Sequence, residues 1–420
     1  MAIAVAVAGG RDARIIGLVS AGHFFSHFYF LVLPPLFPLL KIEFGVSYAS
    51  LGLLLTAASV ATGICQTPVG FLVDRLGARW ILLGGLLLHS AAIVAIGFTS
   101  SYWAILVLFM VAGVANTVYH PADYAILNAR VSRDRLGRAF SIHTFSGNIA
   151  WAIAPAAMVA LTALWDWRSA VIFVGLIGLA TTAVLALNGA DLSDRDEAGV
   201  ADHAKREGAI DDGRTQSGIQ LLLSPPILMA FLFFFFIAMG TGAIRVFSVA
   251  ALVAIYDTPL VAANGVLTGF LAGASAGILA GGLISDKLGR PEITATIGFL
   301  LGAAFLALAG SVSLPIMAMA GVLTAAGFVT GAVQPSRDLL VRRVTPPGSM
   351  GKVFAFVSTG LALGGVIMPI GFGWIMDHAD PRWLFWLSAM IILLTVVTVG
   401  GLSAVSSAES KKSTGHISNS

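Results

Sequence analysis

Histidine and aspartate side chains recur at helical spacing inside long apolar stretches of this chain. His23 and His27 lie four residues apart in one stretch. His120 and Asp123 lie three residues apart in another, so each pair shares one face of a helix. An imidazole with its ordinary pKa of about 6.5 takes up and releases protons near neutral pH. We therefore predict a proton relay through these four side chains, with His143 as a further candidate. The alternative is that backbone carbonyls of packed helices satisfy the histidines.

A single arginine lies deep inside an apolar stretch of the second half. Arg245 follows the aromatic run at 233–236 and has no acidic residue one helical turn away. Its planar guanidinium can bind a carboxylate, phosphate or phosphonate through two hydrogen bonds. We expect Arg245 to bind the anionic group of a substrate, unless the side chain extends to the nearer boundary with water. The other residues expected to bind substrate are polar side chains of the first half: His27, His120 and Asn116.

The chain offers few groups for catalytic or metal chemistry. A transition-metal site needs three or four ligands, whereas Cys65 is isolated and Asp123 is the one carboxylate available to the histidines. The sequence has no Gly-x-x-x-x-Gly-Lys motif for nucleotide phosphates. The scattered His and Asp residues form no paired acid and base. We therefore predict no enzyme activity, no cofactor and no metal site.

The composition is that of an integral membrane protein. Of 420 residues, 57% are hydrophobic and 11% are charged, whereas a soluble domain carries about a quarter charged residues. A helix needs about 20 apolar residues to cross the bilayer. In one such stretch Gly269, Gly273 and Gly277 are spaced by four, which predicts close contact with a neighbouring helix. We predict an all-α membrane protein with twelve transmembrane helices, at residues 15–40, 47–73, 80–98, 102–128, 138–162, 167–189, 226–255, 261–284, 292–311, 314–341, 352–376 and 383–404.

Positively charged residues are distributed unevenly between the connecting segments. With both termini in the cytoplasm, all but four of the 24 Lys and Arg residues fall on the cytoplasmic side. The exceptions are Lys41, Arg168, Arg382 and the intramembrane Arg245. Membrane proteins carry such an excess in their cytoplasmic loops. We therefore predict a protein of a bacterial-type cytoplasmic (inner) membrane, with both termini cytoplasmic.

A charged motif occurs at matching places in the two halves. The sequence GFLVDRLG at residues 70–77 recurs as GLISDKLG at residues 282–289. Such duplication is typical of transporters built from two related bundles. The predicted parts are an N-terminal six-helix bundle at 1–189, a cytoplasmic linker at 190–225, a C-terminal six-helix bundle at 226–404 and a disordered cytoplasmic tail at 405–420.

The repeated motif is expected to control a conformational change. A carboxylate at the end of one span can accept hydrogen bonds from the N-terminus of a neighbouring helix. Glycines at the two ends of the motif permit close approach and a tight turn. The residues assigned to this conformational switch are Gly70, Asp74, Arg75, Gly77, Asp286 and Gly289.

The motif resembles a signature of the major facilitator superfamily. That family carries Gly-x-x-x-Asp-Arg-x-Gly-Arg between its second and third spans, and this chain has the same residues with Arg79 displaced. Other stretches resemble the fosmidomycin-resistance-type exporters of the family, at residues 26–27, 37–40, 66–70, 119–121 and 137–142. The resemblance implies two pseudo-symmetric six-helix bundles, a central cavity lined by spans 1, 4, 7 and 10, and secondary active transport by alternating access.

The resemblance also implies an inner gate at the cytoplasmic ends of spans 4, 5, 10 and 11. Repeat symmetry, at an offset of 214, makes Asp123 equivalent to Arg337. We predict that these two residues pair across the gate, where the low dielectric strengthens an ion pair. In the alternative, Arg337 pairs with its neighbour Asp338.

The favoured function is proton-coupled export of a small anionic or amphipathic compound, such as a drug or metabolite. The main alternative is a proton symporter that takes up a small organic anion. A transition-metal transporter or a non-transporting sensor is less favoured. The expected partners are a small-molecule substrate, protons and the lipid bilayer, and we expect a monomer. We expect no nucleic-acid partner, and the small net charge of +3 says little about one.

Overall fold

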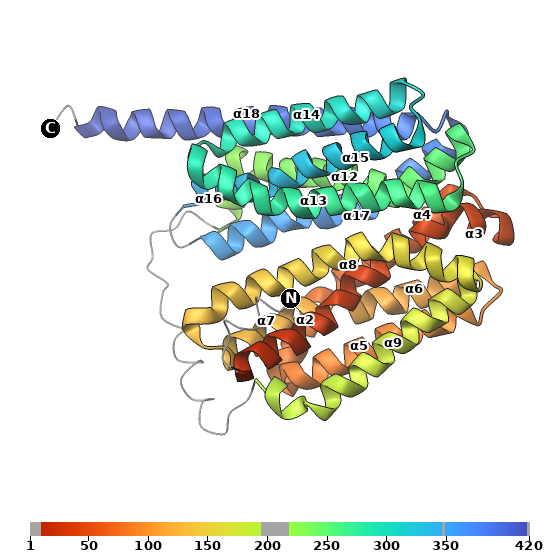
Figure 1. The fold of residues 1–420 in the computed structure, drawn as a ribbon. Helices are drawn as coiled ribbons and strands as arrows, with labels where there is room; N and C mark the ends of the chain where they lie inside the picture. The colour runs from red at the N-terminus through yellow and green to blue at the C-terminus, as the bar shows by residue number, and fades with distance from the viewer. Residues whose placement is uncertain (1–9, 195–217, 347–348, 418–420) are drawn as a thin grey trace. The chain divides into compact units, whose positions relative to one another are not determined.

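The computed structural model describes residues 10–194, 218–346 and 349–417. Every regular element in these ranges is a helix, as the composition predicts (Figure 1). Twelve described segments are long and apolar enough to cross a membrane, which confirms the predicted number of spans. They are Gly10–Phe44, Tyr48–Leu76, Ala78–Gly97, Tyr102–Arg130, Arg133–Leu164, Trp167–Leu187, Pro225–Tyr256, Leu260–Ser285, Pro291–Ser311, Ile316–Arg343, Lys352–His378 and Trp383–Gly401.

The first of two compact units comprises residues 1–46 and 53–213. Its helices are α2 (Gly10–Phe30), α3 (Phe37–Phe44), most of α4 (Tyr48–Leu76), α5 (Ala78–Gly97), α6 (Tyr102–Asn116), α7 (Tyr119–Arg130), α8 (Leu136–Leu164) and α9 (Trp167–Leu187). α2 packs against α8 and α7, and α5 packs against α6 and α9. This packing places α2, α7 and α8 around one core.

The second unit comprises residues 47–52 and 214–420. Its helices are α11 (Gly218–Leu222), α12 (Pro225–Tyr256), α13 (Leu260–Leu288), α14 (Pro291–Ser311), α15 (Ile316–Ala332), α16 (Gln334–Arg343), α17 (Met350–His378) and α18 (Trp383–Ile417). α12 packs against α17 and α18, and α13 lies along α15, as Figure 1 shows.

The first turn of α4 belongs to the second unit, because a side chain near the end of α17 forms hydrogen bonds with its backbone. The carboxylate of Asp377 accepts hydrogen bonds from the backbone N–H groups of Tyr48 and Ala49, both at 2.9 Å. A helix start leaves such N–H groups without intrahelical partners, and a carboxylate satisfies them. A Cβ at Gly52 would lie 2.1 Å from the Pro369 carbonyl oxygen, so the backbones of α4 and α17 are in direct contact here.

The fourth and tenth spans are each broken into two helices at equivalent places. α6 and α7 are separated by two residues, and α15 and α16 by one. Pro121 and Pro335 explain the breaks, since proline lacks the N–H that would bond to the carbonyl four residues earlier and its ring crowds that carbonyl. The sequence prediction had both spans continuous. A break inside a span leaves backbone polar groups for side chains or water to satisfy, as at many transport sites.

Glycine residues hold α13 and α15 in backbone contact. A Cβ at Gly273 would lie 2.3 Å from the carbonyl oxygen of Thr324. A Cβ at Gly277, one turn further, would lie 2.0 Å from the carbonyl oxygen of Phe328. These distances are far below van der Waals contact, so only glycine fits. The close contact predicted from the spacing of these glycines is confirmed.

The segments beyond the spans are described in part. Most of the predicted linker at 190–225 lies outside the described residues, and its ends form η3 (Gly189–Leu192) and α11. α18 continues as helix through Ile417, and the disorder expected for the tail at 405–420 stays a prediction. Extending an existing helix requires no new nucleation, and residues 404–414 contain neither glycine nor proline to end it.

Candidate functional site

A buried cluster of one aspartate and two histidines lies in the core of the first unit. Asp123 on α7 is fully buried, and the buried His23 on α2 and His143 on α8 flank it. His143 Nε2 lies 2.9 Å from Asp123 Oδ2, which is a hydrogen bond. His23 Nδ1 lies 3.3 Å from the same oxygen. Three helices therefore place titratable groups around a single carboxylate.

Two further histidines surround this cluster. The rings of His23 and His143 are stacked, with centroids 3.7 Å apart. The His23 centroid also lies 5.1 Å from that of His120 and 4.7 Å from that of His27. His120 is exposed, and His27 is half-buried with its ring 4.4 Å from that of Trp151. The structure thus brings the four predicted relay residues together, in a series of imidazoles from an exposed ring to a buried carboxylate.

The charge on Asp123 must be balanced inside the unit. Its Oδ1 atom is buried and has no hydrogen-bond partner in the part of the chain that the structure describes. A buried, uncompensated carboxylate costs several kcal/mol, so a proton on it or on an adjacent imidazole is required. A second proton would give the buried cluster a net positive charge, and the cost of burying that charge opposes its uptake. The arrangement is therefore suited to bind and exchange one proton.

The spacing of the cluster fits a hydrogen-bonded proton more closely than a metal ion. His23, Asp123 and His143 each offer one ligand atom, and these atoms lie within 4.8 Å of one another. Ligand atoms about 2.1 Å from a tetrahedral metal ion would lie roughly 3.4 Å apart. The 2.9 Å contact between Asp123 and His143 is shorter and has the length of an N–H···O hydrogen bond.

A second buried network fixes the start of α7. The hydroxyl of Tyr119, the residue before His120, lies 3.2 Å from Nδ1 of His89 on α5. The His89 ring packs edge to face on Tyr29 of α2, with centroids 4.8 Å apart. These contacts join α2, α5 and α7 beside the cluster, so they hold His120 and Asp123 at fixed positions along the unit.

The remaining predicted substrate residues occupy two different settings. Asn116 is the last residue of α6, directly before the break in the fourth span. Its Oδ1 atom is buried and has no hydrogen-bond partner among the described residues, so it can accept a bond from a ligand or water. Arg245 lies on α12 in the second unit and is half-buried. A guanidinium stays charged at physiological pH, so Arg245 places a permanent positive charge within a span.

The predicted gate residues each have partners on their own unit. Arg337 Nε donates to Asp338 Oδ1 at 2.9 Å, and its guanidinium lies 4.6 Å from the centroid of the Phe234 ring. This is the local pairing that the sequence left as the alternative. Asp123 contacts His23 and His143 instead. A pair between Asp123 and Arg337 stays a prediction.

Both copies of the loop motif contain a glycine with positive φ. Gly77 has a φ of 91° directly before α5, and Gly289 has a φ of 62° directly after α13. Residues with a Cβ rarely adopt these values, so the glycines permit the tight turns. A Cβ at Gly70 would meet no atom of the described residues within 4 Å, and the close approach expected of Gly70 stays a prediction. The side chain of Asp286 lies outside the described residues. The switching role of the motif stays a prediction.

The sequence offers His143 as a further relay candidate, but it does not single out Trp151. Both lie on α8, and their contacts with Asp123 and His27 join different helices. Spacing along the chain reports neighbours within one helix and gives no distance between helices. A histidine within a membrane span is itself a signal, because ionisable groups are costly there, and this signal makes His143 a candidate. Trp151 carries no such signal.

The comparisons with known proteins agree with this architecture. The sequence pattern of the Major Facilitator Superfamily matches residues 19–261 and 239–418. The chain is 25% identical over 405 residues to the fosmidomycin resistance protein of Escherichia coli K12, which covers 94% of this chain and 96% of that protein. It is 26% identical over 140 residues to the probable L-galactonate transporter of the same organism, which covers 33% of this chain and 31% of that protein.

A solved structure shows the same fold. The crystal structure of a bacterial homologue of the human lysosomal transporter Spinster, in an inward-facing and occupied conformation, matches with a TM-score of 0.74 at 15% identity. The match covers 96% of this chain and 98% of that one. Since the family pattern extends over nearly the whole length and the fold agrees, this chain belongs to the Major Facilitator Superfamily of membrane transporters.

Proposed function

We propose that this transporter exports a small anionic or amphipathic compound in exchange for protons, by alternating access. The observation that carries the proposal is the buried cluster of Asp123, His23 and His143. A polar cluster of this kind inside a membrane bundle is costly, so such groups are typically retained where they handle ions or protons. Resistance to a compound, the property in the name of the fosmidomycin resistance protein, is most directly explained by removal of that compound from the cell.

The exposed ring of His120 gives the proton a route to the cluster. It lies beside the buried His23, whose Nδ1 atom contacts the carboxylate of Asp123. Imidazoles carry one proton between two nitrogens and change charge near neutral pH, so a series of them can load and unload a buried site. Binding of a proton changes the charge of the cluster by one, which gives the protein two states to couple to the binding of substrate.

The direction of coupling is tested in vesicles that contain the purified protein and a trapped pH-sensitive dye. Fosmidomycin is the first compound to add outside, because the full-length relative is named for it. Entry of the compound in exchange for protons makes the lumen more alkaline. This is the expected result, and it holds for either orientation of the protein in the vesicle. Entry of radiolabelled compound without any change of lumenal pH would contradict proton coupling.

Uptake of an organic anion by proton symport is the second candidate function. It is favoured by the similarity to the probable L-galactonate transporter, whose substrate is an organic anion, and by the permanent charge of Arg245. The same vesicle experiment separates the two candidates by sign. A symporter carries protons inward with its substrate and acidifies the lumen, whereas an exchanger makes it alkaline.

Arg245 is expected to bind the anionic group of the substrate. Arg245→Lys keeps the charge but loses the planar fork, and Arg245→Ala loses both. Hydrogen bonds to charged groups contribute about 1.5–3 kcal/mol, so affinity should fall at least about tenfold in the alanine variant and less in the lysine variant. Calorimetric titration of the purified variants measures this. Arg290→Lys, an exposed arginine outside the spans, is the matched control. Unchanged affinity in both Arg245 variants would mean that the guanidinium does not contact substrate.

A further inference from the structure

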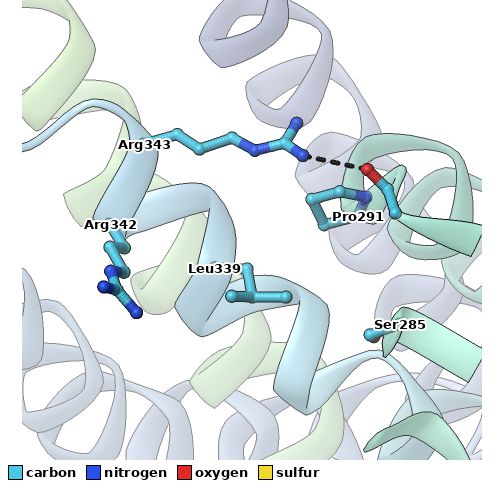
Figure 2. Close-up of a pocket in the computed structure, with 6 residues that line it drawn as sticks. Ser285, Pro291, Leu339, Arg342 and Arg343 are labelled. Carbon is cyan, nitrogen blue, oxygen red and sulfur yellow. Dashed lines mark hydrogen bonds between the residues drawn. The ribbon is translucent and has the colours of Figure 1, made fainter. Parts of the chain in front are cut away.

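A pocket of about 370 Å³ opens at one end of the second unit. It lies between the end of α13, the start of α14 and the short helix α16, as Figure 2 shows. Two membrane spans end at this pocket and a third begins there. The distribution of positive charges predicts that this end of the spans faces the cytoplasm. The pocket therefore lies at the level of the lipid headgroups. Its lining residues are Ser285, Gly289, Pro291, Leu339, Arg342 and Arg343.

Hydrogen bonds hold the Arg343 side chain in place at one side of this pocket. Its Nη1 atom donates to Glu292 Oε2 at 2.8 Å, and its Nη2 atom donates to the carbonyl oxygen of Gly289 at 3.1 Å. Figure 2 shows the side chain extended from α16 toward the start of α14. The ion pair balances the charges of Arg343 and Glu292, so Arg343 mainly shapes the pocket.

Arg342 supplies a charge that no described residue balances. Its side chain is exposed and makes no hydrogen bond or ion pair with the residues that the structure describes. Lys287 and Arg290, on the neighbouring end of α13 and start of α14, are also exposed. The N-terminus of α14, a helix of 21 residues, adds a partial positive charge beside Pro291. The described side chains thus give this end of the unit a positive potential.

Apolar surface continues from the pocket along the spans. Leu339 lines the pocket and is 37% exposed, and Leu288, one turn beyond the lining residue Ser285 on α13, is 52% exposed. A small soluble anion has no groups that would cover these side chains. A phospholipid has both parts, since its phosphate would lie at the arginine and its acyl chains against the leucines.

We propose that this pocket binds the phosphate headgroup of an anionic phospholipid. Basic pockets between transmembrane helices on the cytoplasmic side suit this class of ligand. Arg342 donates charge-assisted hydrogen bonds to the phosphate, and Leu339 contacts the start of an acyl chain. The bound lipid joins α13, α14 and α16 at the turn that carries the second copy of the loop motif. The site is independent of the substrate and of the proton cluster.

The test is native mass spectrometry of the purified full-length protein, titrated with dioleoyl phosphatidylglycerol in detergent. Hydrogen bonds between a guanidinium and a phosphate contribute at least about tenfold in affinity, so Arg342→Gln should weaken the first binding event by at least that factor. Arg342→Lys keeps the charge and should retain most of the affinity. Arg290→Gln is the matched control, because it removes the same charge from the same end without altering the pocket lining, and it should change little.

Equal weakening by Arg342→Gln and Arg290→Gln would overturn the proposal, because surface charge alone would then attract the lipid. Equal affinity of the wild-type protein for zwitterionic phosphatidylethanolamine would overturn it as well. Inorganic phosphate forms the second arm of the titration. Saturable phosphate binding that depends on Arg342, without preference for phosphatidylglycerol, would assign the pocket to a soluble anion. None of these measurements uses transport, so their failure is distinguishable from failure of the proposed function.

Discussion

Replacing Asp123 with asparagine is expected to abolish accumulation of substrate driven by a proton gradient. The asparagine side chain has nearly the same shape but carries no negative charge, so a proton taken up by His23 or His143 would be an uncompensated buried cation, and its uptake becomes unfavourable. Exchange of labelled for unlabelled substrate requires no net proton movement and should continue. Uptake into proteoliposomes, measured with and without an imposed pH gradient, shows both effects. Accumulation should fall to the level of vesicles without protein.

Two further variants make this result specific to the cluster. His143→Gln replaces the imidazole that bonds to Asp123 with an amide that cannot take up a proton, and it should have the same effect on accumulation. His378→Gln is its matched control, because His378 is an exposed histidine at the end of α17 whose ring nitrogen lies 2.9 Å from the Trp374 carbonyl oxygen. If proton-driven accumulation persists in both the Asp123→Asn and the His143→Gln variants, the cluster does not carry the proton.

The second large effect is expected at Gly277, where α13 meets α15. The added methyl group of Gly277→Ala would lie 2.0 Å from the carbonyl oxygen of Phe328, so the two helices must separate. Overpacking typically costs about 1–3 kcal/mol, and the gain in helix propensity from glycine to alanine is only about 1 kcal/mol. The clash therefore dominates, and we expect a lower melting temperature and a lower yield of monodisperse protein. Thermal denaturation followed by size-exclusion chromatography measures both.

Gly265 on the same helix provides the matched control. A Cβ there would meet no atom of the described residues within 4 Å. Gly265→Ala should therefore leave the melting temperature unchanged or raise it, since alanine favours helix. Equal melting temperatures for the two variants would show that the backbones of α13 and α15 are further apart than this structure has them.

The fold could be predicted from the sequence because the bilayer restricts the possibilities. A chain that crosses the membrane must satisfy all its backbone groups internally, so long apolar stretches with few charges become helices. The close contact of α13 and α15 followed in the same way from the spacing of Gly269, Gly273 and Gly277, since small residues at one helix face let backbones meet. Both predictions depend on periodicity within one helix, which the sequence shows directly.

The breaks in the fourth and tenth spans could not be predicted from proline alone. Pro68, Pro155 and Pro369 lie inside helices that continue past them, whereas Pro121 and Pro335 follow breaks. The difference depends on whether neighbouring groups satisfy the freed carbonyl, and this is a property of the packed unit. The partnership of His143 with Asp123 is hidden for the same reason, because the distance between α7 and α8 is set by packing.

The two broken spans have diverged in their chemistry while keeping the same break. In the first unit the short helix α7 has 12 residues, and it carries His120 and Asp123 directly after the break. In the second unit the equivalent helix α16 carries Ser336, whose hydroxyl lies 2.8 Å from that of the buried Ser285. A hydroxyl pair offers no group that changes charge near neutral pH, whereas imidazole and carboxylate groups are the kinds of side chain that can exchange protons. The charged side chain of α16 next to this pair, Arg337, is a guanidinium that stays charged at physiological pH. Under the proposed proton coupling, the driving force would therefore enter this pseudo-symmetric molecule through one of its two halves only.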